Sequence, residues 1–504
     1  METLSRKLII TIYIIFILIQ SGFAQKPNWV DDASRRKLFD EKTYLTSFLI
    51  DSDVEKPAIT AQTKDLKAFA QEQIQSLLQI KLDQQVNSQS LPYFLVDKKE
   101  WIVSVQTIIQ HQHYYDPSEK QLYVLAYLKK SDLQQKYVAA KAQYQQNITK
   151  TLEKSDGKLK QKYYKDALKT CLEGFADLRK LEFMHWALAT LTSVAPDPKG
   201  IDSYKEKLHK QLTKIQQYKT NDLVTVANHL AQCLSIKVGS LDKPVQLLNF
   251  SYRNSGINSQ FSRKFRQVLK AALNKKGIEV AEVNNAILYD AFQRNAYQLK
   301  GSYWEDANQQ QVRLVTVLEE GSSGKLLTSL DVYLDQGPLR QQDIRFKPAQ
   351  YQKALAQIKI FNQNQSPTRG GLELDVWTNK GKQNPIFVQG EDVKFYVKAN
   401  KPCYLRFVYH LADGTTVLLL DNYYIGANKV NQVYEIPQVF ECAAPFGLEI
   451  LHLNAQSRQF GNVPTQRVEG YKVIMGGISE FLKSSRGARN ARAETKVLIT
   501  TLKN

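Results

Sequence analysis

Residues 390–420 read GEDVKFYVKANKPCYLRFVYHLADGTTVLLL, and this stretch decides the fold of the C-terminal part of the chain. It holds short runs rich in β-branched and aromatic residues, which are typical of strands. Turn-forming residues separate the runs at 400–402 and 412–414. The pattern predicts strands at Val393–Ala399, Cys403–His410 and Thr416–Leu420.

Similar runs continue on both sides of this stretch. Strands are predicted at Leu372–Thr378, Gly447–Leu453 and Lys496–Leu502, with a helix around Ser479–Ser484 before the last of them. Many short strands at this spacing are typical of a β-sandwich, which we assign to residues 372–504. A polar linker at 361–371 precedes the sandwich.

The same region carries a family resemblance. The matching pieces are Gly390-Glu391, Ala412-Asp413-Gly414, Ile436-Pro437 and Pro445-Phe446-Gly447, in the family's order and spacing. On these residues the segment 372–504 resembles a DUF4384 domain. The resemblance implies no established activity.

Residues 241–360 alternate between strand and helix patterns. Strands are predicted at Val245–Tyr252, Gly277–Val280, Gln298–Glu305, Val312–Leu318 and Leu326–Leu334, and helices at Asn258–Asn274 and Ala286–Asn295. The order β-α-β-α-β-β-β indicates a small α/β domain.

This domain resembles the small α/β domain of curli-secretion and flagellar outer-membrane accessory proteins, which is similar to the N-terminal domain of the TolB translocation protein. The resemblance is carried by Phe265, Leu269, Leu273 and Gly277, by LKGSYW at 299–304 and by the hairpin at 318–327. It implies a structural role rather than a catalytic one.

Residues 131–238 are predicted to be helical throughout. Ser131 and Gln134 form a capping-box pattern, and Asp156-Gly157 is expected to break the first helix. The next helix has an apolar stripe, which we interpret as core: Tyr164, Leu168, Cys171, Leu172, Phe175, Leu178, Leu181 and Trp186. Short connections favour antiparallel neighbours, so we expect a helical hairpin or a three-helix bundle.

Residues 25–130 mix strand and helix patterns and predict an α+β domain. We expect a strand at Tyr44–Ile50, a helix at Thr60–Leu78 that passes into a strand at Gln79–Asp83, and a strand at Gln121–Leu128, whereas residues 101–110 fit strand or helix. The whole chain is therefore expected to be a multidomain α+β protein.

With Trp29 near its start and YVLAYLKKSDL at 123–133, this first domain resembles the LPP20-like domain of bacterial envelope proteins. That fold is similar to the N-terminal domain of the flagellar H-ring assembly protein. Residues Ser47–Ile50 stand where the family has a glycine-rich strand, so no ligand role is assigned to them.

The first residues have the pattern of a signal peptide. Arg6-Lys7 precedes an apolar run at 8–19 and a small-x-small cleavage pattern at 22–24. We predict a signal peptide at 1–24 and an exported chain from Gln25. The run is shorter than the about 20 apolar residues of a membrane-spanning helix, and the cleavage pattern has no neighbouring cysteine. The expected location is therefore the periplasm or the outer membrane, with neither a transmembrane segment nor a lipid anchor.

The formal net charge of +19 favours anionic partners such as lipid headgroups, lipopolysaccharide phosphates, acidic glycans or nucleic acid. Export argues against nucleic acid, and solvated lysine-rich helices are the alternative explanation. Four basic residues recur every three positions near the C-terminus: Lys483, Arg486, Arg489 and Arg492. On a helix they would form a ridge that binds phosphate or carboxylate groups, and on a loop they would be solvated.

Motifs for chemistry are weak. His111 and His113 would share one face of a strand and could bind a metal, but a third ligand at a set spacing does not accompany them. The segment 321–325 (GSSGK) lacks the preceding glycine and the following helix of a phosphate loop. We assign no catalytic, cofactor-binding or metal-binding residue.

Four cysteines suggest two disulfides in an oxidising compartment, Cys403 with Cys442 and Cys171 with Cys233. Each bond would stabilise the fold by roughly 2–4 kcal/mol. The alternative is that all four are buried thiols that act as small apolar side chains.

Three functions remain at this point. The first is a non-enzymatic envelope adaptor that docks protein partners or anionic envelope polymers. The second is a β-sandwich that binds a glycan or peptide through exposed aromatic side chains, for which the candidates are Trp377, Tyr396, Tyr404, Tyr409, Tyr423 and Tyr424. The third, a hydrolase, lacks a recognisable set of catalytic residues.

Overall fold

The computed structural model describes residues 26–52, 54–88, 104–192, 199–216, 222–238, 241–281, 289, 292, 295–306, 310–363, 371–437, 439–468, 470–475 and 491–503. These residues form two compact units. Unit 1 comprises the part up to residue 74 and residues 108–132, and unit 2 comprises residues 75–107 and everything from 133 onward. The predicted signal peptide lies outside the described residues.

Unit 1 is an antiparallel sheet with helices. Its elements are α2 (Asp32–Leu38), β1 (Tyr44–Asp51), the first part of α3 (Ile59–Ser88), β2 (Gln110–Asp116) and β3 (Gln121–Lys129), with strand order β1-β3-β2. Trp29 packs with Phe48, Tyr123 and Leu125 on the sheet. The guanidinium carbon of Arg35 lies 3.6 Å from the centre of the Phe48 ring and covers this cluster.

The prediction of a strand at Gln79–Asp83 is wrong, because α3 continues as one helix to Ser88. Ile74, Leu78 and Leu82 keep a four-residue spacing and are all buried, so the helical period continues through the segment. In the segment left undecided by sequence, residues 104–106 are helical and β2 begins at Gln110.

Among the residues that the structure describes, the helical part of unit 2 has four helices rather than two or three: α5 (Lys130–Lys160), α6 (Tyr164–Thr192), α7 (Lys199–Gln216) and α8 (Leu223–Val238). The expected break at Asp156-Gly157 falls inside α5, which ends at Lys160 instead. Space around Gly157 is open, so nothing there forces the helix to end. The predicted stripe on α6 is buried apart from Tyr164, which is exposed at its start.

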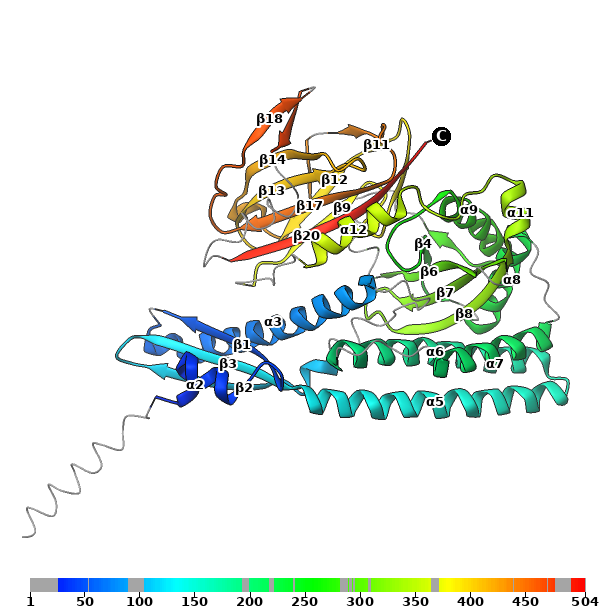
Figure 1. Ribbon diagram of the computed structural model, residues 1–504, viewed down its shortest axis with the longest axis horizontal. Helices are drawn as coiled ribbons and strands as arrows, with labels where there is room; N and C mark the ends of the chain where they lie inside the picture. Colours follow the sequence, from blue (N-terminus) through cyan, green and yellow to red (C-terminus); the bar gives the residue numbers. More distant parts are fainter. Residues whose placement is uncertain are drawn as a thin grey trace, which may run out of the picture. The chain divides into compact units, whose positions relative to one another are not determined.

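The α/β part of unit 2 consists of β4 (Val245–Tyr252), α9 (Gln260–Lys275), β5 (Val280–Ala281), β6 (Tyr297–Asp306), β7 (Gln311–Glu320) and β8 (Leu326–Asp335). The strand order is β5-β4-β6-β7-β8, with β4 parallel to β5 and β6 and the remaining pairs antiparallel. Helices α6 and α8 pack on β8, and α9 packs on β4 and α8 (Figure 1). Most of the predicted helix Ala286–Asn295 lies outside the described residues.

Two helices that the sequence did not suggest follow the sheet, α11 (Gln336–Gln341) and α12 (Tyr351–Gln363). Helix α12 therefore takes up the start of the predicted linker 361–371, most of which lies outside the described residues. The ring of Phe361 contacts the edges of His410 and His452, with ring centres 4.8 and 5.3 Å apart. This contact anchors the end of α12 on the sandwich.

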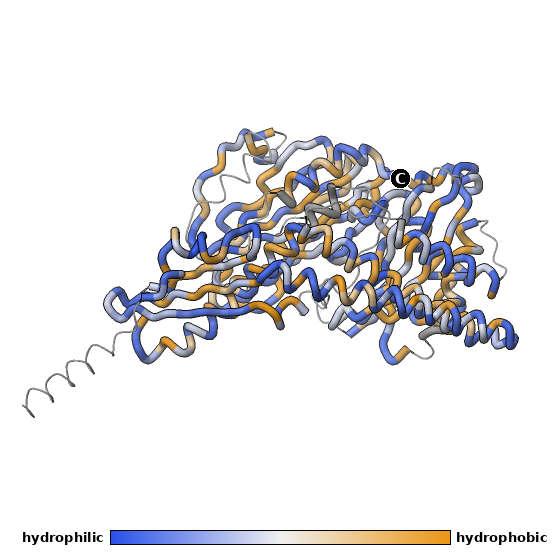
Figure 2. Tube along the Cα trace, turned by 60° about the horizontal axis from the view of Figure 1, so that its bottom comes forward, coloured by the Kyte–Doolittle hydropathy of each residue, from blue (hydrophilic) through white to orange (hydrophobic). Residues whose placement is uncertain are grey.

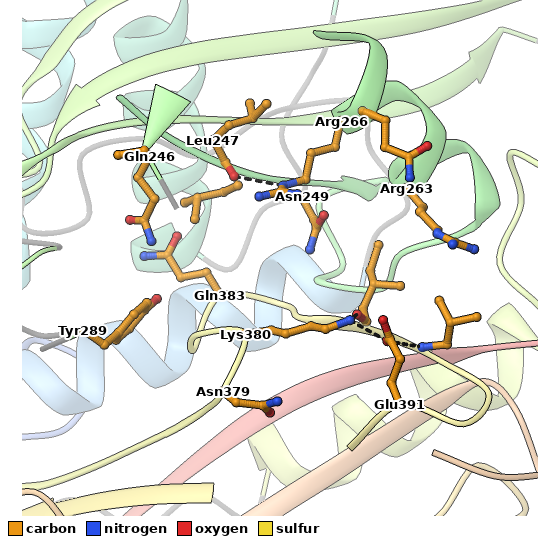
Figure 3. Close-up of a pocket in the computed structure, with 15 residues that line it drawn as sticks. Gln246, Leu247, Asn249, Arg263, Arg266, Tyr289, Asn379, Lys380, Gln383 and Glu391 are labelled. Atoms are coloured by element: carbon orange, nitrogen blue, oxygen red, sulfur yellow. Dashed lines mark hydrogen bonds and ion pairs between the residues drawn. The ribbon is translucent and has the colours of Figure 1, made fainter. Parts of the chain in front are cut away.

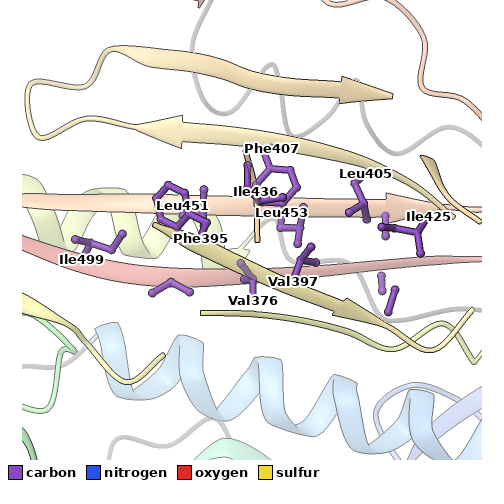
Figure 4. Close-up of a cluster of buried hydrophobic side chains, with 14 of the residues drawn as sticks. Val376, Phe395, Val397, Leu405, Phe407, Ile425, Ile436, Leu451, Leu453 and Ile499 are labelled. Carbon is purple, nitrogen blue, oxygen red and sulfur yellow. The ribbon is translucent and has the colours of Figure 1, made fainter. Parts of the chain in front are cut away.

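The C-terminal part is a β-sandwich. Its strands are β9 (Leu374–Thr378), β10 (Ile386–Val388), β11 (Asp392–Val393), β12 (Phe395–Ala399), β13 (Cys403–His410), β14 (Thr416–Ile425), β15 (Tyr434–Glu435), β16 (Phe440–Glu441), β17 (Leu448–Gln456), β18 (Thr465–Val468), β19 (Tyr471–Ile474) and β20 (Arg492–Leu502). One sheet has the order β10-β20-β17-β13-β14-β19-β18 and the other β15-β12-β9. Alternate side chains such as Leu405, Phe407 and Val397 fill the space between them (Figure 4).

Apolar and polar residues alternate over short distances along the chain (Figure 2). Among the described residues, no helix has the length and apolar character needed to cross a membrane. The fold class predicted from the sequence, a multidomain α+β protein with a β-rich C-terminal part, is confirmed.

Candidate functional site

A cavity of about 370 Å³ lies where β4 and α9 face the loop between β9 and β10. The α/β part supplies one wall and the sandwich supplies the other (Figure 3). Arg263, Arg266, Lys380 and Glu391 line it, so three cations stand against one carboxylate. The cavity therefore has an excess of positive charge and suits an anionic ligand.

Helix α9 positions the two arginines. Ser259 and Ser262 form a reciprocal capping box that fixes where the helix begins. Because Phe261 and Phe265 on the opposite side are fully buried against the sheet, Arg263 and Arg266 are turned towards the cavity. The Nε of Arg266 donates to the carbonyl oxygen of Leu247 at 3.1 Å, which holds this side chain along β4.

The loop between β9 and β10 forms the opposite wall. The backbone nitrogen and Oγ1 of Thr378 both donate to the carbonyl oxygen of Gly381, at 3.0 and 2.8 Å. Gly381 has φ +92°, and a Cβ there would lie 2.7 Å from the ring of Tyr289. The backbone nitrogen of Lys382 donates to the Tyr289 hydroxyl at 3.0 Å. The loop is thus held against Tyr289 by a contact that requires glycine.

Tyr289 itself is a fixed support. Its ring stacks on Trp377, which stacks on Tyr396, with ring centres 6.1 and 6.3 Å apart. Burial raises the pKa of Tyr289 to about 12, so its hydroxyl stays protonated at neutral pH. It can hold the loop and donate or accept a hydrogen bond, but it is not suited to act as a base.

The cation of the loop is tied to the carboxylate. Lys380 forms an ion pair with Glu391, and its Nζ also donates to the carbonyl oxygen of Ile386 at 3.0 Å. The Glu391 carboxylate accepts from the backbone nitrogen of Val388 at 2.7 Å. These bonds fix Glu391 at the rim, opposite the arginines of α9 (Figure 3).

Neutral amides fill the remaining polar wall. Nε2 of Gln383 donates to Gln298 at 3.3 Å, and Nε2 of Gln298 donates to Gln246 at 3.5 Å. Nδ2 of Asn249 donates to the carbonyl oxygen of Asn384 at 3.0 Å. These amides join the two walls and add uncharged donors and acceptors to the cavity.

A second charged cluster lies fully buried between α6 and the sheet. Arg179 contacts Glu182 at 2.6 Å and Asp331 at 3.0 Å, and Arg313 contacts Asp331 at 2.5 Å. Burial by itself would raise the pKa of Asp331, but the two arginines hold it below its usual value. For Glu182, burial outweighs the arginines and raises the pKa. The cluster joins the helices to the sheet.

Most of the basic ridge predicted from the sequence lies outside the described residues, namely Lys483, Arg486 and Arg489. Arg492 is the first residue of β20, where it pairs with Gln456 of β17. Arg492 therefore lies on a strand, not on a helix or a loop. The anion-binding role of the four residues stays a prediction.

The histidine pair lies on a strand, as expected. His111 is half-buried and His113 exposed on β2. Desolvation and the nearby Lys67 lower the pKa of both. The described residues contain no group of three side chains placed to hold a metal ion.

All four cysteines are buried, and no disulfide joins them in the structure. Cys403 and Cys442 are both thiols in the structure, and the disulfide between them stays a prediction. Cys442 exchanges backbone hydrogen bonds with Gly390 and Glu391, while Cys403 follows the far end of the same extended segment, after Ala399. Both residues belong to the core cluster of the sandwich.

Cys171 and Cys233 lie on the packed helices α6 and α8, so their proximity agrees with the sequence. Cys171 donates to the carbonyl oxygen of Leu208 at 3.8 Å, and Cys233 lies 3.7 Å from Nε2 of His229. Burial, with a smaller effect of Cys233, raises the pKa of the Cys171 thiol to about 12. Both are thiols in the structure, and the disulfide between them stays a prediction.

The aromatic residues proposed for glycan binding do not form one exposed face. Trp377 and Tyr396 are buried beneath Tyr289, and Tyr409 donates to Glu449 at 2.6 Å inside the sandwich. Tyr423 packs against the core. Tyr424 is exposed and lies beside Tyr404, with ring centres 4.8 Å apart.

The residues of the cavity carry no motif that predicts them from the sequence. Arg263 and Arg266 were hidden in an amphipathic helix, and Lys380 and Glu391 lie more than a hundred positions away. The sequence feature that could have indicated this site is the pair of arginines on the polar face of α9, whose opposite face carries two phenylalanines. A single sequence does not indicate which distant loop this face meets.

Comparison with known proteins identifies one domain. Residues 386–456 match the family described as Domain of unknown function (DUF4384), which confirms that resemblance for this segment. It includes Ile386, Val388 and Glu391 of the cavity. No curated protein matches the chain. Among solved structures, the LpoB C-terminal domain from Salmonella enterica (Sel-Met) matches with 16% identity and a TM-score of 0.19, over 23% of this chain and 99% of that chain.

Proposed function

We propose that this chain is an exported, non-enzymatic accessory protein of the bacterial cell envelope that docks protein partners or anionic envelope polymers. The signal-peptide pattern at 1–24 supports export. The net charge of +19 supports anionic partners. The LPP20-like and TolB-like resemblances of residues 25–130 and 241–360 support an envelope role.

The observation that carries the proposal is the cavity with excess positive charge at the junction of the α/β part and the sandwich. Two of its three cations are held in place, Arg266 by Leu247 and Lys380 by Ile386 and Glu391, so these two are positioned before a ligand arrives. Prepositioned cations reduce the entropy that binding costs. The cavity offers charge and hydrogen bonds to an anion, and this arrangement favours binding over proton transfer.

The glycan-binding alternative draws on one observation in the sandwich. Tyr404 and Tyr424 form an aromatic pair with Tyr424 half exposed, at 52% of its surface. Such a pair offers a flat apolar surface to a sugar ring. Binding of purified neutral polysaccharide that Tyr424→Ala abolishes would favour this alternative.

To test this proposal, the full chain is expressed with a C-terminal affinity tag. Intact cells are crosslinked, and the tagged protein is then captured with its bound partners. We expect a mature N-terminus at Gln25 and co-purification of envelope proteins or anionic polymer. Protein recovered inside the cell and still beginning at Met1 would overturn the envelope role. Turnover of a substrate by the purified protein would overturn the non-enzymatic part.

A further inference from the structure

We infer that the cavity between α9 and the loop joining β9 and β10 binds a sugar that carries a carboxylate or phosphate group. This inference rests on the proposed function, because acidic glycans are among the anionic partners that it includes. It names the site and the chemical class of ligand, which the general proposal leaves open.

The anionic group is assigned to the α9 side of the cavity. Arg263 and Arg266 lie three positions apart on helix α9, and both line the cavity. A guanidinium matches a carboxylate or phosphate with two parallel hydrogen bonds. Since Nε of Arg266 is already bonded to Leu247, this residue meets the ligand through its terminal nitrogens.

Lys380 closes the anionic end from the opposite wall. Its Nζ is shared between Glu391, the carbonyl oxygen of Ile386 and the face of the Phe387 ring, 4.7 Å from the ring centre. This lysine is therefore held at the rim rather than extended into solvent. The Glu391 carboxylate beside it repels a second anionic group and accepts hydrogen bonds from hydroxyl groups.

The sugar ring is assigned to the amide wall. Asn249, Gln246 and Gln383 each carry both a donor and an acceptor, which is what vicinal hydroxyl groups require. Leu248, Ile386 and Val388 add apolar surface for the ring carbons. A cavity of about 370 Å³ lies at the small end of the roughly 300–1,000 Å³ range of ligand sites. It therefore suits a compact ligand or the terminal unit of a polymer.

These two halves together exclude simpler ligands. An inorganic anion would contact the cations and leave the amide wall unused. A neutral sugar would leave the positive charge of the rim uncompensated. A ligand with both an anionic group and hydroxyl groups matches all of the lining residues.

To test the inference, the mature full chain is titrated separately with D-glucuronate, glucose 6-phosphate, glucose and inorganic phosphate. Isothermal titration calorimetry measures the binding in each case. We expect binding of at least one of the two acidic sugars, and at least about tenfold weaker binding of glucose and phosphate. The difference between glucuronate and glucose 6-phosphate shows which anionic group is preferred. Phosphate that binds as tightly as glucose 6-phosphate, or failure of both acidic sugars to bind, would overturn the inference.

Variants locate the site. Arg263→Gln is expected to weaken binding at least about tenfold, and Arg263→Lys to restore part of the loss, because lysine keeps the charge without the paired geometry. Lys264→Gln is the matched control, since it removes the same charge from the next, exposed position outside the cavity. Equal affinities of wild type and Arg263→Gln would place any observed binding elsewhere.

The same variants separate the inference from the proposed function. If wild-type protein captures nothing from crosslinked envelopes, the proposed function fails. If wild type and Arg263→Gln capture equal amounts, the adaptor function stands and the assignment of this cavity fails.

Discussion

Unit 2 contains two clusters of charged residues at junctions between its parts, and they differ in burial and balance. Where α6 meets the sheet, Arg179 and Arg313 face two carboxyl groups, and all four side chains are nearly inaccessible to solvent. Where the sandwich meets α9, three cations face the single carboxylate of Glu391 around a cavity. In the first cluster two cations face two carboxyl groups, whereas the second keeps excess positive charge open to solvent.

This difference separates a structural ion cluster from a binding site. Buried charges must be paired, and removing one partner leaves the others uncompensated. Charges at a solvated rim contribute little to stability and remain available to a ligand. Both places combine basic residues with carboxyl groups, so the distinction comes from what surrounds each charge.

The largest expected effect is at the buried cluster. Asp331→Ala would leave Arg179 and Arg313 without their shared partner, at a cost of about 3–5 kcal/mol of unfolding free energy. Urea unfolding followed by tryptophan fluorescence measures this, because Arg313 lies against the ring of Trp304. Glu206→Ala on the exposed face of α7 is the control and should unfold as wild type does. A loss for Asp331→Ala as small as that for the control would mean that the cluster does not hold the helices to the sheet.

The buried carboxyl group of Glu449 extends the comparison to pH dependence. Glu449 accepts from Tyr409 at 2.6 Å, and burial raises its pKa to about 7. Its unfolded pKa is about 4.3, so its contribution to stability is full below that value and is lost as pH rises through about 7.

We expect Glu449→Gln to remove part of this pH dependence, on the order of 2 kcal/mol between pH 5 and 8. Unfolding free energies at a series of pH values, compared between wild type and variant, provide the measurement. Parallel curves for the two proteins would show that Glu449 is ionised in the native state throughout this range.

A smaller effect is expected where the loop wall meets Tyr289. Gly381→Ala would bring a Cβ within 2.7 Å of the Tyr289 ring at a positive φ, whereas Gly470→Ala has the same kind of φ and open space around it. The first variant should lose about 1–2 kcal/mol more than the second, because the overpacking is added to the backbone strain. Thermal unfolding of both variants measures the difference. Equal losses of stability in the two variants would mean that the loop moves away from Tyr289 without an energetic penalty.

The smallest effect on stability is expected at the rim. Arg263 is exposed, so Arg263→Gln should leave the unfolding midpoint in urea unchanged within error. A marked loss of stability would mean that Arg263 is a structural residue, and the contrast between the two clusters would disappear.

The sequence predicted the parts of the fold that depend on local pattern. The strands Val245–Tyr252 and Cys403–His410 appear with the bounds expected, because their alternation and flanking turns are both strong. The segment Gln79–Asp83 was misassigned because five residues fit period two and the end of a helix equally well. Helix α12 was missed because its pattern merges with the polar residues that follow it.

The candidate site could not be predicted because it depends on tertiary contacts. The cavity joins α9 to a loop more than a hundred positions later, and Gly381 marks that loop only once Tyr289 is known to lie against it. Charge alone indicated an anionic partner but not its place.

The most direct measurement compares three folded proteins: wild type, Asp331→Asn and Arg263→Gln. It measures their affinity for whichever of D-glucuronate and glucose 6-phosphate the wild type binds more tightly. The account predicts that Asp331→Asn binds as wild type does despite lower stability, and that Arg263→Gln binds at least about tenfold more weakly despite unchanged stability. Equal binding by wild type and Arg263→Gln, with binding lost in Asp331→Asn, would contradict it.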